Sequence, residues 1–153
     1  MIKLLRVDYR LIHGQVAYAW TNYLGADCIL VANDGLSADP IRVQALKLSK
    51  PAGIKLVLKG VEDSIKAINS SVTDKYKLFI LVDNMKDARR MAQGCPSITS
   101  VNVGNLFAAG GRALSVRCYA TDEDIGIIKE LMADNIEIDI RSVPTDPKAV
   151  PNL

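Results

Sequence analysis

The chain has 153 residues, 49% of them hydrophobic, and a formal net charge of +2, which fits one globular domain with a sizeable core. Its 19 lysines and arginines are spread along the sequence and form no basic block of the kind that binds nucleic acid. No apolar run approaches the ~20 residues that span a bilayer, and the N-terminus lacks the pattern of a secretory signal. The three cysteines include no close pair, which argues against a disulfide framework and fits a reducing cytosol. With a single histidine, we expect no metal and no cofactor.

Short β-branched runs alternate along the chain with longer amphipathic stretches. We expect strands at residues 3–8, 28–33, 55–59, 77–82, 100–103, 113–119 and 137–142. We expect helices at residues 14–24, 40–48, 61–69, 86–93 and 122–133. This alternation predicts a single α/β domain over residues 1–153, with a mostly parallel central sheet of about seven strands and helices on both faces. Because residues 102–113 show no helix pattern, the sixth strand is expected to pair antiparallel at an edge of the sheet.

Several helix boundaries have local causes. Asp39 stands before a proline and can cap the second helix. Thr121 precedes three acidic residues, which suit the first turn of a helix. Gly94 can end the fourth helix. The tail at residues 144–153 contains three prolines, and we expect it to be extended or partly disordered.

The only histidine, His13, stands between the first expected strand and the first expected helix. Ligands of α/β sheets bind beyond the carboxyl ends of the strands, so this imidazole is expected at the ligand-binding edge. Side chains two apart in a strand share a face, which predicts that Arg6, Asp8 and Arg10 point the same way. A helix that begins at Gly14 would offer free N–H groups to an anion, with no Cβ in the way.

These residue types suit a site that carries a phosphoryl group. A neutral imidazole is a nucleophile near neutral pH, and arginine holds phosphoryl oxygens with a planar fork of donors. Asp8 would keep one ring nitrogen of His13 as N–H and leave the other free to attack. The alternative is that His13 caps or packs, that Arg6 and Arg10 are surface residues, and that Asp8 is a turn residue. Local composition leaves both interpretations open.

The run at residues 6–16, R-V-D-Y-R-L-I-H-G-Q-V, together with Trp20, resembles a known family. It is similar to the IIB component of the mannose/fructose/sorbose family of the bacterial phosphoenolpyruvate-dependent sugar phosphotransferase system (PTS). Further segments resemble that family in order and spacing, namely residues 31–34, 100–105 and 143–145. The resemblance spans essentially the whole chain. It implies a mostly parallel sheet flanked by helices, which agrees with the elements expected above.

The resemblance also implies a function. In that family the motif histidine accepts a phosphoryl group from a phosphohistidine of the IIA component and passes it to a sugar brought in by the membrane IIC and IID components. His13 falls on this position, and the family implies its Nδ1 atom as the carrier. The chain would then be a stand-alone cytoplasmic IIB subunit, peripherally associated with the membrane permease. The surrounding loop positions of the family correspond to Arg6, Asp8, Arg10, Gly14 and Gln15. Tyr9 falls on a variable position and receives no role.

The sugar is a separate question. The V-A-N-D-x-x-x-x-D-P run at residues 31–40 and the N-V-G-N run at 102–105 resemble members that handle N-acetylgalactosamine or galactosamine. Because the membrane components mainly recognise the sugar, we give this similarity little weight and expect a hexose or an amino sugar.

Other residues have two interpretations each. Asn33 and Asp34 end the second expected strand and either line the phosphoryl site as a second layer or form a capped turn. Trp20 has helical spacing to apolar neighbours and is expected in the core rather than at a partner surface. The glycines at 104 and at 110–111 are expected in turns rather than in a phosphate cradle. Asp83 follows the fourth expected strand as a phospho-accepting aspartate would, but a receiver domain also needs a clustered acidic pair and a lysine after a later strand, and that lysine cannot be placed.

Two alternative functions remain at this level. In one, the chain is a regulatory binding module, and phosphorylation of His13 only changes its affinity for a protein partner. In the other, it is a flavodoxin-like domain that binds a small ligand or nucleotide. The second has no motif support, because the sequence contains neither GxxxxGK[ST] nor GxGxxG.

Overall fold

The structure is a computed structural model that describes all residues from Met1 to Leu153. Six strands form one sheet: β1 (Ile2–Asp8), β2 (Cys28–Ala32), β3 (Lys55–Lys59), β4 (Leu78–Val82), β5 (Ser100–Asn105) and β8 (Glu137–Asp139). Five α-helices connect or follow them: α1 (Gly14–Leu24), α2 (Pro40–Ser49), α3 (Val61–Asn69), α4 (Met85–Gly94) and α5 (Asp122–Ala133). A short 3-10 helix, η1 (Leu36–Ala38), precedes α2.

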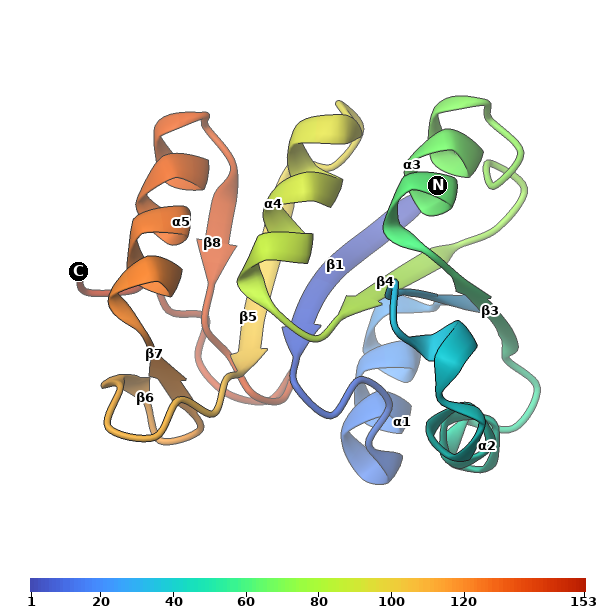
Figure 1. Cartoon of the computed structure of the whole chain (residues 1–153), viewed down its shortest axis with the longest axis horizontal. Coiled ribbons are helices and arrows are strands. Elements are labelled where there is room, and N and C mark those ends of the chain that lie inside the picture. The colour runs from blue at the N-terminus through green and yellow to red at the C-terminus, as the bar shows by residue number, and fades with distance from the viewer.

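The strand order is β3-β2-β4-β1-β5-β8, and every neighbouring pair is parallel. In Figure 1, α3, α4 and α5 lie on one face of this sheet, and α1 and α2 lie on the other. The predicted α/β class, with a parallel sheet between two helix layers, is therefore confirmed.

The predicted strand at 113–119 differs from the structure. Two strands, β6 (Arg112–Ser115) and β7 (Cys118–Ala120), form an antiparallel hairpin that is separate from the main sheet. The main sheet consequently has six strands, all parallel, and no antiparallel edge strand. The chain reverses at Val116 and Arg117, where no glycine or asparagine signals a turn.

The other predicted boundaries lie close to the observed ones. The Asp39 carboxylate accepts a hydrogen bond from the backbone N–H of Arg42 and caps α2. Thr121 and Asp124 form a reciprocal capping box at the start of α5. The last predicted strand ends three residues early, at Asp139, because the N–H of Ile140 donates instead to the carbonyl of Ala149 in the tail.

Two hydrophobic cores hold the layers together. The larger core lies between the sheet and α3, α4 and α5, and the smaller one lies against α1 and α2. Strands β2 and β4 are buried along their whole length because helices cover both of their faces. In β1, Leu5 and Val7 point into the larger core. The alternating residues of β1 therefore face α1, and two of these, Arg6 and Asp8, are charged.

The tail at 144–153 contains no helix or strand and runs along the protein surface. Pro151 is buried, and Ala149 and Leu153 pack against the larger core. Lys148 pairs with Glu137, and Arg112 donates to the carbonyl of Asn152. The tail is extended, as one of the two expectations had it, and these contacts fix it to β8 and the hairpin.

Candidate functional site

The chain leaves the neighbouring strands β1 and β5 in opposite directions. After β1 it crosses to β2 through α1, and after β5 it continues to β8 through the hairpin and α5. Such a switch point leaves a crevice at the carboxyl ends of the strands, where α/β proteins bind their ligands. His13 stands at this point, in the loop between β1 and α1.

His13 is the N-cap residue of α1, and its side chain is exposed. Its backbone carbonyl accepts from the N–H groups of Val16 and Ala17, but its imidazole makes no capping hydrogen bond. The first N–H groups of α1 thus keep no side-chain acceptor. Gly14 adopts a φ of +20° with open space beside it, so an anion can approach the backbone at this helix end.

Behind the loop lies a buried row of charges. Arg6 and Asp8 are each 1% exposed, and Arg6 Nη2 lies 3.1 Å from Asp8 Oδ2. The other carboxylate oxygen of Asp8 accepts from the backbone N–H of Arg10 at 3.0 Å and from Arg10 Nε at 3.4 Å. The predicted common side of Arg6, Asp8 and Arg10 is thus found in the structure. The row carries one net positive charge, which favours an anionic ligand.

Asp8 accepts hydrogen bonds from these two arginines rather than from the histidine. Both of its oxygens are engaged by Arg6 or Arg10, and no hydrogen bond joins Asp8 to His13. The role suggested from spacing, in which Asp8 fixes a ring nitrogen of His13, therefore has no counterpart in the structure. Instead, Asp8 holds Arg10 in place.

Two opposing effects act on the pKa of the buried Arg6. Desolvation, the largest effect, lowers the pKa of the Arg6 guanidinium, and the Asp8 carboxylate raises it. Arg6 Nη1 also donates to Asn102 Oδ1 at 2.6 Å and to the carbonyl of Arg141 at 3.3 Å. These acceptors compensate the buried charge and fix the guanidinium under the site.

Space for Arg6 comes from Gly104. The register of β1 against β5 shifts between Val7 and Asp8, so that Gly104 is an extra residue on β5. A Cβ atom at Gly104 would overlap the Arg6 guanidinium. Gly104 therefore lies within a strand and admits a buried side chain, whereas the sequence suggested a turn glycine.

A segment from the end of the chain closes the site from the side. Trp20, 1% exposed, donates from Nε1 to the carbonyl of Ser142 at 3.0 Å. The Ser142 hydroxyl donates to the carbonyl of Gly104 at 3.2 Å. The guanidinium of Arg6 lies 5.2 Å from the centre of the Trp20 ring, and that of Arg141 lies 5.4 Å from it. Trp20 is a core residue, as predicted, and it also holds the segment that follows β8.

Together these residues surround a cavity of about 170 Å³ beside His13. It is lined by Arg6, Arg10, His13, Val16, Asn105, Arg117, Ser142 and Val143. The Asn105 amide, with its oxygen toward Arg10, accepts from Arg10 Nε at 3.1 Å and donates to the carbonyl of Arg117 at 2.8 Å. The guanidinium of Arg117 has no carboxylate partner within ion-pair distance. The cavity thus joins a histidine with three arginines, which is a suitable environment for a phosphoryl group.

Several of these residues were missed from the sequence. Arg117, Asn105 and Ser142 come from the hairpin, from β5 and from the segment after β8. Only the N-V-G-N run gave a signal, because it was noted as part of the family resemblance.

Asn33 and Asp34 lie outside this cavity. The side-chain oxygen of Asn33 accepts from the N–H of Gly35, and Asp34 accepts from the N–H of Val61 and from Arg90. They line a different hollow, between β2 and α3. The capped turn, one of the two interpretations, describes them.

The remaining candidates also have defined places. Gln15 is exposed at the start of α1 and lines a neighbouring groove that includes Val143. Tyr9 stacks obliquely on Phe107, with ring centres 6.0 Å apart. Asp83 pairs with Arg42 at 3.0 Å. No group of three or more His, Cys, Asp or Glu side chains gathers anywhere as a metal site would require.

Comparison with known proteins identifies the family. The family model described as "PTS system sorbose subfamily IIB component" matches residues 2–151. The chain belongs to this family of PTS IIB components. It is 36% identical over 149 residues to the mannose-specific EIIAB component of Escherichia coli, with 97% of this chain and 46% of that protein aligned. It is 42% identical over 106 residues to the "Probable phosphotransferase enzyme IIB component" of Streptococcus pyogenes, with 69% of this chain and 65% of that protein aligned. The chain thus spans about half to two thirds of these relatives.

A solved structure agrees. The IIBSor domain of the sorbose permease from Klebsiella pneumoniae superposes with a TM-score of 0.90 at 28% identity, and covers 97% of this chain and 92% of that one. The chain thus has the fold of a PTS IIB component as well as the sequence pattern of that family. None of its helices has the length and apolar character needed to cross a membrane.

Proposed function

We propose that His13 is the phosphoryl carrier of this IIB component. The observation that carries the proposal is the cavity in which its exposed imidazole, a helix end without a side-chain cap and three arginines come together. In the family that the sequence resembles, the histidine at this position carries the phosphoryl group on its Nδ1 atom. The donor is a phosphohistidine of a IIA component, in keeping with the EIIAB designation of the E. coli relative.

The phosphoryl group moves in two steps, from the donor histidine to His13 and then from His13 to the sugar. A ring nitrogen of neutral His13 attacks the phosphorus in line, an N–P bond forms, and the N–P bond of the donor histidine breaks. In the second step a sugar hydroxyl oxygen attacks, an O–P bond forms, the N–P bond of His13 breaks, and the hydroxyl proton is released. Arg10, with the N–H groups of Gly14 and Gln15, stabilises the charge on the equatorial oxygens.

Arg6 and Asp8 act from beneath the site. Both are buried: Arg6 lines the cavity from below, and Asp8 connects to the cavity through Arg10, whose N–H and Nε bond to it. We assign them a positioning role, because they fix the loop and the Arg10 fork. Asn33 and Asp34 receive no role in transfer.

The partners follow from the same proposal. A phosphorylated IIA protein transfers its phosphoryl group to His13, and membrane IIC and IID components present the sugar. The chain therefore acts in the cytoplasm, bound peripherally to the membrane permease. Names of similar proteins point to different sugars, mannose for one and sorbose for another. The sugar is therefore proposed only as a hexose or amino sugar.

Mass spectrometry at alkaline pH tests the carrier role. The protein is incubated with phosphoenolpyruvate, the general phosphotransferase proteins and a panel of IIA proteins, each shown to be charged. The expected result is one acid-labile phosphoryl group on the His13 peptide. Absence of this adduct with every charged IIA protein would overturn the proposal.

The regulatory alternative predicts a different flow of phosphate. A regulator would accept the group on His13 but would not deliver it to sugar when the membrane components are added. Transfer of labelled phosphate to sugar therefore decides between carrier and regulator.

A further inference from the structure

A second cavity lies on the other side of the sheet from His13. It has a volume of about 280 Å³ and lies between β2, β3 and β4, the helix α3 and the loop that follows α3. It reaches the amino ends of these strands, where Cys28, Lys55 and Leu78 stand. His13 lies at the carboxyl end of β1 and on the α1 face. Nothing in the proposed phosphoryl transfer uses this second cavity.

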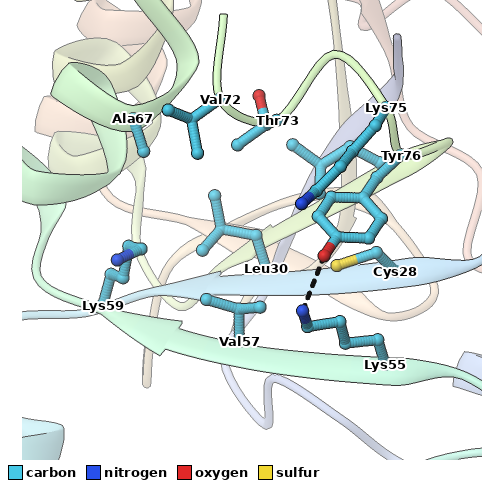
Figure 2. Close-up of a pocket in the computed structure, with 11 residues that line it drawn as sticks. Cys28, Leu30, Lys55, Val57, Lys59, Ala67, Val72, Thr73, Lys75 and Tyr76 are labelled. Carbon is cyan, nitrogen blue, oxygen red and sulfur yellow. Dashed lines mark hydrogen bonds between the residues drawn. The ribbon is translucent and has the colours of Figure 1, made fainter. Parts of the chain in front are cut away.

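The floor and roof of the cavity are apolar. Leu30 and Val57 form the floor, and Ala67 and Val72 close it from α3 and the following loop, as Figure 2 shows. Seven of the eleven lining residues are hydrophobic. A sugar or sugar phosphate would leave its hydroxyl groups without partners against these side chains, so the cavity suits an apolar body.

Lysines provide the charge at the rim. Lys55 and Lys59 stand at the two ends of β3, and Lys75 comes from the loop. No carboxylate lines the cavity, and none of these three lysines forms an ion pair. Two of them meet at Tyr76 (Figure 2): Lys55 Nζ donates to the Tyr76 hydroxyl at 2.6 Å, and the Nζ atoms of Lys55 and Lys75 lie 4.8 Å and 5.2 Å from its ring centre.

The cavity combines unpaired positive charge with an apolar hollow, so it suits a ligand that has an anionic group and an apolar body. An anionic head would lie between Lys55 and Lys75 with the Tyr76 hydroxyl as a further donor. The rest of the ligand would bury its apolar surface against Val57, Ala67 and Val72. The volume is near the lower end of the range for small-molecule sites, roughly 300–1,000 Å³. The ligand is therefore small.

We propose that this cavity binds a small amphiphilic anion, an aromatic or branched apolar body that carries one carboxylate or phosphate group. The ligand approaches from the β3 edge of the sheet, where the lysines are exposed to solvent. Because the cavity lies on the opposite face from His13, binding there leaves the phosphoryl cavity open.

Titration of the ¹⁵N-labelled full chain by NMR tests the proposal. The probe is phenyl phosphate. Two partial probes serve as controls: inorganic phosphate has the anionic group but no apolar body, and benzyl alcohol has the apolar body but no charge. We expect saturable shifts with phenyl phosphate alone, confined to the cavity residues. Absence of saturation with phenyl phosphate, or equal binding of either partial probe, would overturn the proposal.

Two pairs of substitutions test whether the rim lysines bind the anionic group of the ligand. Lys55→Gln with Lys75→Gln should weaken phenyl phosphate binding by roughly tenfold or more, since it removes both charged donors at the head. Lys47→Gln with Lys129→Gln makes the same change in net charge on α2 and α5, and should leave the affinity unchanged. Equal weakening by both pairs would mean attraction to the whole basic protein and would contradict a built site.

A third variant fills the cavity. Ala67→Phe should abolish phenyl phosphate binding while phosphoryl acceptance on His13 stays at the wild-type level. Because the titration needs neither a IIA protein nor sugar, its failure would leave the proposed carrier role untouched, and failure of the carrier role would leave this site untouched.

Discussion

At the scale of single residues, the proposed carrier His13 contributes little to the stability of the fold. Its side chain is exposed, and only its backbone carbonyl takes part in the first turn of α1. Removing the imidazole thus breaks no buried contact. The proposed carrier role and the stability of the fold can be separated at this position.

The first prediction follows from that separation. His13→Ala should abolish phosphoryl acceptance from charged IIA, and its melting temperature should stay within about 2 °C of the wild type, as for a surface substitution. Phosphate incorporation and thermal unfolding check the two halves. Labelling of this variant at the wild-type level would remove His13 from the mechanism.

Arg10 is a partly exposed arginine of the His13 cavity with a fixed position. It is 23% exposed, anchored by Asp8 and lines the His13 cavity. Arg10→Ala should slow phosphoryl transfer by about a hundredfold, because a preorganised donor to the equatorial oxygens is lost. Single-turnover transfer from charged IIA measures the effect.

Arg42→Ala is the matched control for Arg10. Arg42 is also partly exposed and paired with an aspartate, Asp83, but it lies outside the cavity. Its removal should leave the transfer rate within about twofold of the wild type. An equal loss in both variants would indicate a general effect of charge rather than a role for Arg10.

At the scale of elements, the bulge between β1 and β5 determines where Arg6 fits. Gly104→Ala should destabilise the fold by about 1–3 kcal/mol, because the new Cβ overlaps the Arg6 guanidinium and one of the two must move. Urea denaturation measures the loss, and phosphoryl transfer should slow as well because Arg6 supports Asp8.

Gly126→Ala provides the comparison. Gly126 lies inside α5, where an added Cβ meets no atom within 4 Å. This substitution should be neutral or stabilising by up to ~1 kcal/mol, as expected for glycine to alanine within a helix. If both glycine variants behaved alike, the close packing of Arg6 against β5 would be refuted.

Sequence patterns predict those elements that depend on local causes. Helices α2 and α5 begin at the capping residues Asp39 and Thr121, and the β-branched runs form the strands. The pairing of Arg6 with Asp8 follows from alternation within one strand. These features need only neighbours in the sequence.

The rest depends on contacts between distant segments. Arg117 and Ser142 reach the cavity only because β5 lies beside β1 and β8 lies beside β5, an order that periodicity does not encode. The hairpin reverses at Val116, a β-branched residue in a run that otherwise reads as one strand. Likewise, the space that Arg6 needs at Gly104 depends on the strand register.

At the scale of the whole molecule, burial keeps the cysteines protonated. Burial raises the pKa of Cys95 to about 11 and that of Cys118 to about 12, and both side chains are fully buried. An unfolded chain releases these protons near pH ~9. Since the folded pKa values are the higher ones, the stability linked to these thiols is complete below pH ~8.5 and falls as the pH rises above 9.

Urea denaturation at pH 7.5 and pH 10 checks this dependence. We expect a lower free energy of unfolding at pH 10, and a smaller difference between the two pH values in the Cys95→Ala, Cys118→Ala double variant. That comparison removes the contribution of lysines and tyrosines, which titrate in both proteins. An unchanged difference would show that the thiols do not contribute.

The segment after β8 has a consequence for how the protein is made. Arg6 and Asn102 donate to the carbonyl of Arg141, and Trp20 donates to that of Ser142. A ribosome synthesises His13 well before these acceptors. While residues 139–143 are still inside the exit tunnel, the buried Arg6 lacks part of its acceptors, and the cavity has no side wall. A nascent chain therefore presents the proposed nucleophile before the pocket exists, and we expect it to accept a phosphoryl group only after residues 139–143 have left the tunnel.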